Sequence, residues 1–583
     1  MIRQVARRLL TAPAIRRGLC SDSSRVQSAH QVFAALTKNR PVFRITEPVD
    51  VIREPSVFYK GLLRGIAQAK SRIVLSSLYL GSDDPELVSA LDQALAANQA
   101  LRVDILLDCL RGTRSDSHGQ SSATMLAPLV RKYGDERVRV AMYHTPALNG
   151  ISKRLWPQRY NETFGLQHIK AYVFDDELIV SGANLSRDYF TNRQDRYIRI
   201  GSRGLAAYFV ELVRAIASFS FILGAERNLA MPVGVPDPSR DPREFVAVAN
   251  SVMTGFLGRA QAENSVTGDD IDEADTLAIP TVQMSQLGIT QDEEHMREFF
   301  HITDTYARLH GCRNLMASAY FNFSDFHKHN VLRSSSRWDL LVASPRANGF
   351  YTASGISRYI PDMYSIIEHE FLKSARSCGR PDIAVEEYYR DGWTFHGKGV
   401  WCYLDQKLPQ LTMIGSPNYG YRSIYCDLET QITLIPGTAG SQLRNDLHQE
   451  ALSLLSHSEM VTEAGLEKLL DIAENARIAL YAMSTANQQS GDMLPTPIEL
   501  LLPPLLIMLS VLGGLTALLF LALGYPNSLD RLVYWLLPQR AFQLMLYTLA
   551  GVHFVRAVVM YLVSHMSANG LGVIGEITSC HCL

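Results

Sequence analysis

Two segments of the sequence repeat one set of side chains at matching spacing. Each copy has a histidine, a lysine two positions later, an asparagine further on and a carboxylate eleven positions after it: His168, Lys170, Asn184 and Asp195, then His396, Lys398, Asn418 and Glu429. Residues two apart on a strand project to the same face, so each His-x-Lys pair presents an imidazole and an ammonium group together. Two such faces packed against each other would form one pocket.

That pocket suits a phosphodiester substrate. Lysine and asparagine N–H groups stabilise charge on the non-bridging oxygens as phosphorus becomes pentacoordinate. One histidine attacks phosphorus and the other protonates the leaving oxygen, and the spacing does not decide which does which. Asp195 and Glu429 are each expected to orient one imidazole, as carboxylates do in other histidine sites. The cationic side chains stabilise the charge, so we expect no metal and no cofactor.

The elements that must position these residues alternate along the chain. Apolar residues at helical spacing are followed by short apolar runs bounded by turn residues. We expect helices over 58–69 and 86–98 and strands over 72–79 and 101–107. Helices alternating with buried strands indicate the α/β class, with an α/β sandwich.

The same order returns later in the chain. A helix ending near His310 leads to an apolar run over 314–320, and residues 338–343 resemble residues 103–107. The chain is therefore expected to be internally duplicated. We assign residues 40–245 to a first half and 301–485 to a second, packed with pseudo-twofold symmetry.

Residues 246–300 are expected to be a linker and connecting segment. Their acidic stretch, 263–275, reads as a solvated surface loop, because its carboxylates lack the spacing, central glycine and final glutamate of a calcium loop.

Both ends of the chain differ in composition from the middle. Residues 1–21 contain five arginines and no acidic residue, which is typical of a mitochondrial transit peptide. Residues 498–566 are predicted to form a hydrophobic helical hairpin associated with a membrane. In it Leu500–Leu523 carries no charge and is long enough to span, while Ala541–Ser564 carries Arg556.

Size and charge limit the function classes. A chain of 583 residues exceeds what one hydrophobic core usually fills. The net charge of -2 gives no global basic field, which argues against a nucleic-acid partner. The eight cysteines show no disulfide framework, so a reducing compartment fits.

The repeated motif resembles that of the phospholipase D superfamily, whose members carry His-x-Lys-x4-Asp twice. The first copy matches in full and adds Asp175 to the catalytic set that the resemblance implies. The second departs from the pattern, since Tyr403 stands at the aspartate position and Asp405 comes two residues late.

Longer segments of the sequence resemble one particular family within this superfamily. Residues 181–186, 189–197, 389–401 and 414–423 are similar to the mitochondrial CDP-diacylglycerol–glycerol-3-phosphate 3-phosphatidyltransferases, the phosphatidylglycerophosphate synthases of eukaryotes, and the similarity covers about 40–485. The resemblance implies transfer of a phosphatidyl group from CDP-diacylglycerol to glycerol 3-phosphate with release of CMP. It also implies that the protein acts at the mitochondrial inner membrane and contacts the lipids of that membrane. Oligomeric state does not follow from it.

Residue roles are carried over from the same resemblance. It implies His168 as the nucleophile that forms a phospho-histidine, and His396 as general acid to CMP and then base to the acceptor. Four arginines are candidates for the acceptor phosphate, because arginine binds phosphate through two parallel hydrogen bonds: Arg187, Arg193, Arg196 and Arg422.

Three other readings remain open. A phosphatidylserine synthase would use the same donor with serine as acceptor. A hydrolase, either a phospholipase or a nuclease, would let water intercept the phospho-histidine. A membrane scaffold without activity would carry a degenerate site, although both copies keep their histidine, lysine and asparagine.

Overall fold

The computed structural model describes residues 28–150, 161–265, 276–353, 360–404 and 407–461. All of these belong to one compact unit, Met1–Ala476. The predicted transit peptide, the predicted hydrophobic hairpin and Asp405 lie outside the described residues. Within those residues, no helix is both long enough and apolar enough to cross a membrane.

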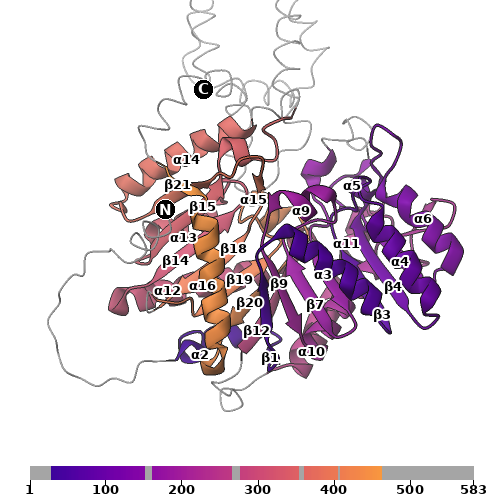
Figure 1. The fold of residues 1–583 in the computed structure, drawn as a ribbon, viewed down its shortest axis with the longest axis horizontal. Helices are drawn as coiled ribbons and strands as arrows, with labels where there is room; N and C mark the ends of the chain where they lie inside the picture. Colours follow the sequence, from indigo (N-terminus) through magenta and orange to yellow (C-terminus); the bar gives the residue numbers. More distant parts are fainter. Residues whose placement is uncertain (1–27, 151–160, 266–275, 354–359, 405–406, 462–583) are drawn as a thin grey trace, which may run out of the picture. The chain divides into compact units, whose positions relative to one another are not determined.

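The first half is built on a nine-stranded sheet in the order β11-β10-β5-β4-β3-β6-β7-β9-β2 (Figure 1). Its strands are β2 (Val49–Ile52), β3 (Arg72–Ser76), β4 (Arg102–Asp108), β5 (Val138–Tyr143), β6 (Ala171–Phe174), β7 (Glu177–Ser181), β9 (Tyr197–Gly201), β10 (Phe221–Leu223) and β11 (Leu229–Ala230). The neighbours β3, β4 and β5 run parallel, and the other pairs are antiparallel.

The second half is built on a ten-stranded sheet in the order β1-β12-β20-β19-β18-β14-β15-β16-β21, with β13 paired to β12. Its strands are β1 (Phe43–Ile45), β12 (Thr276–Met284), β13 (Ile289–Thr290), β14 (Arg313–Ser318), β15 (Arg337–Ala343), β16 (Ala384–Tyr388), β18 (Gly399–Tyr403), β19 (Leu411–Gly415), β20 (Glu429–Ile435) and β21 (Ser458–Met460).

The two sheets share one topology. The run β5-β4-β3-β6-β7-β9-β2 corresponds strand by strand to β16-β15-β14-β18-β19-β20-β12. The parallel trio of the first sheet is matched by β14, β15 and β16, and the remaining pairs of this run are antiparallel in both sheets. The expected duplication and α/β class are therefore confirmed.

Helices cover both faces of each sheet (Figure 1). In the first half they are α3 (Pro55–Gln68), α4 (Glu86–Ala97), α5 (Cys109–Thr113), α6 (Ser122–Tyr133), α9 (Arg187–Thr191), α10 (Arg203–Ser218) and α11 (Pro242–Glu263). Those that follow are α12 (Gln291–His310), α13 (Asp325–Arg333), α14 (Ile360–Ser377), α15 (Tyr421–Tyr425) and α16 (Ser441–Leu455). A short helix, α2 (Ala29–Val32), precedes the first half.

Alternation along β3 shows how the core is divided. Ile73 and Leu75 pack with Phe58 and Leu62 of α3 in an outer cluster. Val74, which points to the opposite face, belongs to a central cluster that includes residues of both sheets and of α10, α11 and α16. A third cluster lies between the second sheet and α12, α13 and α14. The apolar central cluster holds the two halves together.

Residues 246–300, expected to be a linker, contain most of α11, all of β12 and the first half of α12. Since β12 occupies the place in the second sheet that β2 has in the first, we propose that the second half begins at β12. In addition, β1 pairs with β12, so the chain at residues 43–45 belongs to the second sheet. Most of the predicted acidic loop, 266–275, lies outside the described residues.

Candidate active site

The two halves exchange backbone hydrogen bonds at the histidines. His396 follows β17 (Thr394–Phe395), which pairs in parallel with β8 (Arg193–Gln194) of the first half, and its N–H donates to the carbonyl of Gln194 at 2.7 Å. In the same way the N–H of His168 donates to the carbonyl of Leu428 at 2.9 Å. Each histidine backbone is thus fixed by the residue that directly precedes the carboxylate of the other half.

As a consequence, each histidine is paired with the carboxylate of the other half. His396 Nδ1 lies 2.7 Å from Oδ2 of Asp195, which belongs to the first half. His168 Nδ1 lies 3.0 and 3.1 Å from the two carboxylate oxygens of Glu429, which belongs to the second. An Nδ1–H that donates to a carboxylate leaves the Nε2 lone pair for chemistry. One site therefore contains both histidines, each oriented by its partner half.

Two buried lysines complete this centre. Lys170 Nζ donates to the carbonyl of His168 at 2.6 Å, and Lys398 Nζ donates to that of His396 at 2.7 Å. Both are fully buried, and Lys398 Nζ lies 3.8 Å from Asp195. Gly182 makes this approach possible, because a Cβ there would lie 2.8 Å from Asp195 Oδ1 and 3.0 Å from Lys398 Nζ. Both pairs lie just before β6 and β18 instead of within a strand.

Burial sets the protonation states of the centre. Burial and the neighbouring lysine charge lower the pKa of His168 and of His396 well below the ordinary value. Burial raises the pKa of Asp195 to about 6 and that of Glu429 to about 7. It lowers the pKa of Lys398 to about 8. At neutral pH both imidazoles are thus neutral and can act as nucleophile or base.

The two asparagines lie beside this centre. Asn184 Nδ2 donates to the hydroxyl of Tyr189 at 3.1 Å, and the backbone carbonyl of Asn418 accepts from Ser318 at 2.8 Å. Among the described residues, neither buried Asn Oδ1 has a hydrogen-bond partner. Both amides therefore keep hydrogen-bonding capacity that a substrate could use.

Tyr189 contacts the centre although no role is expected for it from the sequence pattern. Its hydroxyl lies 3.3 Å from His396 Nε2, and its ring meets the imidazole edge-on at 5.0 Å. Within the described part of the chain, Nε2 of His168 has no such partner. The two histidines therefore differ at the nitrogen that reacts. Tyr189 is buried and five positions after Asn184, a pattern that also fits an ordinary core residue.

Asp175 lies at the far end of β6 from the histidine, so the structure does not bring it to the centre. It occupies the two-residue turn between β6 and β7 with a φ of 52°, a left-handed conformation that aspartate tolerates. Its carboxylate accepts the backbone N–H groups of Lys70, Ser71 and Arg72 at 2.7–3.1 Å. Asp175 therefore anchors the start of β3, and the structure does not place it among the catalytic groups to which the resemblance assigns it.

The second half differs at its corresponding hairpin. There β18 ends at Tyr403 and β19 begins at Leu411, so the connection is longer than the two residues between β6 and β7. Tyr403, at the motif's aspartate position, is buried, and its hydroxyl lies 3.3 Å from His448 Nδ1. The departure from the repeated motif thus coincides with a longer connection, while His396 and Lys398 keep their places just before β18.

The four candidate arginines have different surroundings. Arg196 is fully buried and donates two hydrogen bonds of 2.9 Å to the Glu450 carboxylate, one of 2.7 Å to the Met413 carbonyl and one of 3.0 Å to Thr412. Its guanidinium also lies 3.7 Å from the ring centre of Trp401. Because its donors are taken, Arg196 is removed from the phosphate-binding candidates.

Two of the other arginines lie near the histidines. Arg193 stacks over Tyr189 at 4.8 Å and contributes to the lowered pKa of His396 after burial and Lys398. Arg422 pairs with Asp427 at 2.9 Å and keeps 42% of its side chain exposed. Arg187 is exposed at the start of α9. Arg187, Arg193 and Arg422 remain candidates for a phosphate.

Known proteins resemble this chain along most of its length. A family model described as "Cardiolipin synthase, PLD-like domain" matches residues 62–216. A probable CDP-diacylglycerol–glycerol-3-phosphate 3-phosphatidyltransferase of Dictyostelium discoideum is 40% identical over 441 residues, which cover 72% of this chain and 74% of that protein. The mitochondrial protein of that name from Gallus gallus is 38% identical over 478 residues, 76% of this chain and 84% of its own.

Among solved structures, a phosphatidylserine synthase from Haemophilus influenzae Rd KW20 matches with a TM-score of 0.58 and 18% identity. The match covers 78% of this chain and 99% of that one. At this identity it shows a shared fold.

Proposed function

The chain belongs to the family of CDP-diacylglycerol–glycerol-3-phosphate 3-phosphatidyltransferases, and on that premise we propose how its crossed histidine pairs perform the reaction. A phosphatidyl group is transferred from CDP-diacylglycerol to glycerol 3-phosphate, giving phosphatidylglycerophosphate and CMP. The observation that carries the proposal is the single centre in which two neutral imidazoles, oriented by Asp195 and Glu429, lie among two buried lysines.

In the first step His168 Nε2 attacks the phosphorus that bears the diacylglycerol. The N–P bond forms, the P–O bond to CMP breaks, and CMP departs as a phosphate anion. Lys170 and Lys398 stabilise the negative charge on the non-bridging oxygens during this step, in a buried setting where charge interactions are strong. The product on the enzyme is a phosphatidyl-histidine.

In the second step a hydroxyl of glycerol 3-phosphate attacks the same phosphorus. His396 Nε2 takes the hydroxyl proton as the O–P bond forms and the bond to His168 breaks. The hydroxyl of an alcohol is a weak nucleophile, so this step depends on a base more than the departure of CMP depends on an acid.

The difference between the two histidines supports this division of roles. Nε2 of His396 lies 3.3 Å from the Tyr189 hydroxyl and 3.2 Å from Lys398 Nζ, so it already faces polar hydrogen-bonding groups. Nε2 of His168 has no partner among the described residues, as an attacking atom requires.

We propose a mitochondrial location, at the inner membrane. The relative from Gallus gallus carries the word mitochondrial in its name, and the arginine-rich composition of residues 1–21 agrees with it. Expression of the full chain with a C-terminal tag, followed by fractionation of mitochondria, would test this. Recovery of the protein outside mitochondria would contradict it.

CMP release from CDP-diacylglycerol by the purified full chain tests the reaction. Parallel assays contain glycerol 3-phosphate, serine or no acceptor, with His168→Asn as the control. Release that requires glycerol 3-phosphate and yields phosphatidylglycerophosphate supports the proposal. Release that requires serine would indicate a phosphatidylserine synthase, release without any acceptor a hydrolase, and no release a scaffold.

A further inference from the structure

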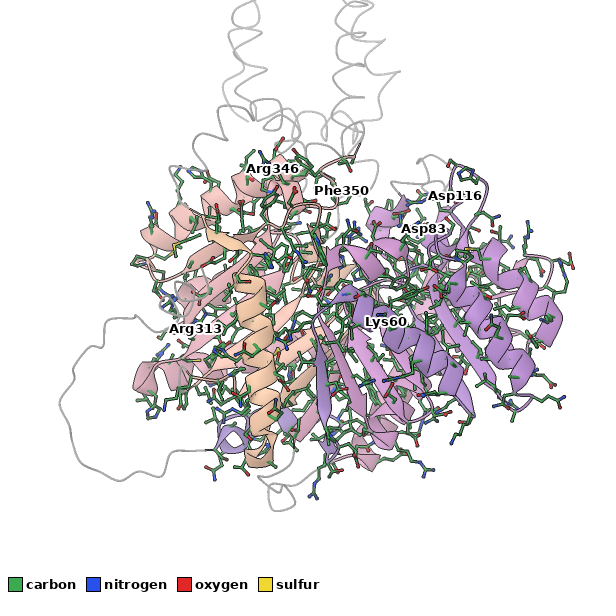
Figure 2. All side chains as sticks on the ribbon, viewed as in Figure 1. Lys60, Asp83, Asp116, Arg313, Arg346 and Phe350 are labelled. Carbon is green, nitrogen blue, oxygen red and sulfur yellow. The ribbon has the colours of Figure 1, made fainter. Side chains whose placement is uncertain are left out.

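A hollow separate from the two histidines lies on the first half, where the parallel strands β3 and β4 end. It has a volume of about 250 Å³ and is lined by the turns that follow these strands and by the start of α9. Figure 2 shows two residues of its lining, Asp83 and Asp116, close together at one edge of the first half. The carboxyl ends of parallel strands are the usual place for ligand pockets in α/β proteins.

One wall of this hollow carries two arginines. Arg111 and Arg114 both pair with Glu162, so the group keeps a net positive charge. The Arg111 guanidinium lies 4.5 Å from the ring centre of Tyr79, which fixes its plane. The side chains of Arg111 and Arg114 keep 19% and 32% of their surface exposed, so each can reach a ligand. Two held guanidinium groups suit one phosphate group.

The rest of the lining carries the hydroxyls of residues such as Ser82, Ser115 and Ser186 and the carboxylates of Asp83, Asp116 and Asp188. These groups accept hydrogen bonds from hydroxyls and repel additional negative charge. A nucleoside diphosphate would bring two phosphates against the carboxylates, and acyl chains would leave these polar groups without partners. A small polyol with a single phosphate suits this lining, because its phosphate can bind the two arginines and its hydroxyls can donate to the carboxylates.

The hollow is joined to the catalytic centre by short contacts. Tyr79 OH lies 3.3 Å from Ser186 Oγ, and Ser186 is two positions after Asn184. The Asp108 carboxylate accepts the N–H of Arg111 at 2.8 Å and the N–H of Gln167, the residue before His168, at 3.0 Å. The arginine wall and the His168 segment are therefore held by one buried side chain.

We propose that this hollow is the acceptor subsite, in which Arg111 and Arg114 bind the phosphate of glycerol 3-phosphate. The proposal rests on the proposed function and assigns its acceptor end. The acceptor hydroxyl groups then extend past Ser186 towards the base His396. The subsite selects acceptors that carry a phosphate, which water and serine lack.

Steady-state kinetics of the full-length Arg114→Gln variant test this. We expect the KM for glycerol 3-phosphate to rise about 10-fold or more, as for loss of a charged hydrogen bond, while the KM for CDP-diacylglycerol stays unchanged. Exchange of labelled CMP into CDP-diacylglycerol, which needs no acceptor, should also persist and would show that the variant is folded. Arg131→Gln is the matched control, because Arg131 pairs with Glu226 outside the hollow.

Ser115→Glu provides a second test at an exposed lining residue. The added negative charge should raise the KM for glycerol 3-phosphate and weaken competitive inhibition by inorganic phosphate. An unchanged KM for glycerol 3-phosphate in both variants, or a raised KM for CDP-diacylglycerol, would overturn the acceptor assignment. If the wild-type chain transfers nothing to glycerol 3-phosphate, the proposed function fails instead.

Discussion

At the scale of residues, the centre depends on two carboxylates, each of which orients the histidine of the other half. Asp195 orients His396, and Glu429 orients His168. A histidine without its carboxylate loses both the preferred tautomer and the stabilisation of the imidazolium that forms during proton transfer. Because the two histidines are assigned to different steps, the two carboxylates should be separable by kinetics.

Asp195→Asn should slow transfer to glycerol 3-phosphate about 100-fold or more, in line with the loss of general base catalysis. It should slow CMP exchange less, since CMP attacks as an anion and needs no base. Glu429→Gln should lower both rates together, because each passes through His168. Both rates are measured on the same preparation of the full chain. Equal losses of exchange and transfer in Asp195→Asn would contradict the division of roles.

The rate of CMP exchange should follow pH with a maximum between about 7 and 8. Burial raises the pKa of Glu429 to about 7, so its carboxylate is protonated as pH falls below that value and His168 loses its partner. Burial lowers the pKa of Lys398 to about 8, so this cation is present below that pH and lost above it. A pH–rate profile checks this, and a rate that keeps rising to pH 10 would contradict the role of Lys398.

Asp175→Asn should change stability and leave the chemistry nearly intact. Burial raises the pKa of Asp175, but hydrogen bonds from Lys70, Ser71 and Arg72 outweigh that effect and hold it below the ordinary value. Loss of the charge should cost about 1–3 kcal/mol, measured as a lower Tm, with kcat changed less than about threefold, since the anchor lies outside the catalytic centre. A large fall in kcat at unchanged Tm would return Asp175 to the catalytic set.

At the scale of elements, Arg196 on the segment before β9 joins the halves. Its guanidinium lies inside the second half, paired with Glu450 of α16 and stacked on Trp401 of β18. A buried ion pair contributes little when replaced as a whole, but removal of one member leaves the other charged and buried.

Glu450→Gln should therefore lower the free energy of unfolding by about 3–5 kcal/mol. Asp50→Asn is the matched control, since the Asp50–Arg199 pair is partly exposed and should contribute about 1 kcal/mol or less. Chemical denaturation of both variants compares them. Equal effects of the two substitutions would mean that the Arg196 pair does not hold the halves together.

The elements and most of the centre could be predicted from the chain, and the reasons for the exceptions are local. The repeated His-x-Lys and the equal Asn-to-carboxylate spacing indicated one composite site. Spacing within each copy does not show which carboxylate pairs with which histidine. Each histidine pairs with the carboxylate of the other half because β8 packs beside β17 and Gln167 beside Leu428.

Other exceptions have similar causes. The strand β12 was missed because Pro280 weakens its strand pattern. The position of Asp175 away from the histidine could not be predicted, because a motif does not show at which end of β6 its last residue lies. Arg111, inside α5, and Arg114, directly after it, have no spacing in the sequence that would single them out as candidates for a ligand site.

At the scale of the whole molecule, the duplication explains both the symmetry of the centre and its limits. Two sheets of one topology bring two equivalent His-x-Lys segments together, yet a transfer reaction needs one nucleophile and one base. The two halves differ around that need, since the Tyr189 hydroxyl lies beside Nε2 of His396 and the arginine-lined hollow lies on the first half.

The central claim is that His168 carries the phosphatidyl group and His396 serves the acceptor. The most direct measurement incubates full-length His168→Asn and His396→Asn with CDP-diacylglycerol labelled at the phosphatidyl phosphorus, without acceptor, and follows acid-labile label on the protein. We expect label on His396→Asn, because CMP departs as an anion with little help, and none on His168→Asn. Label on His168→Asn, or none on either variant while the wild type transfers, would contradict it.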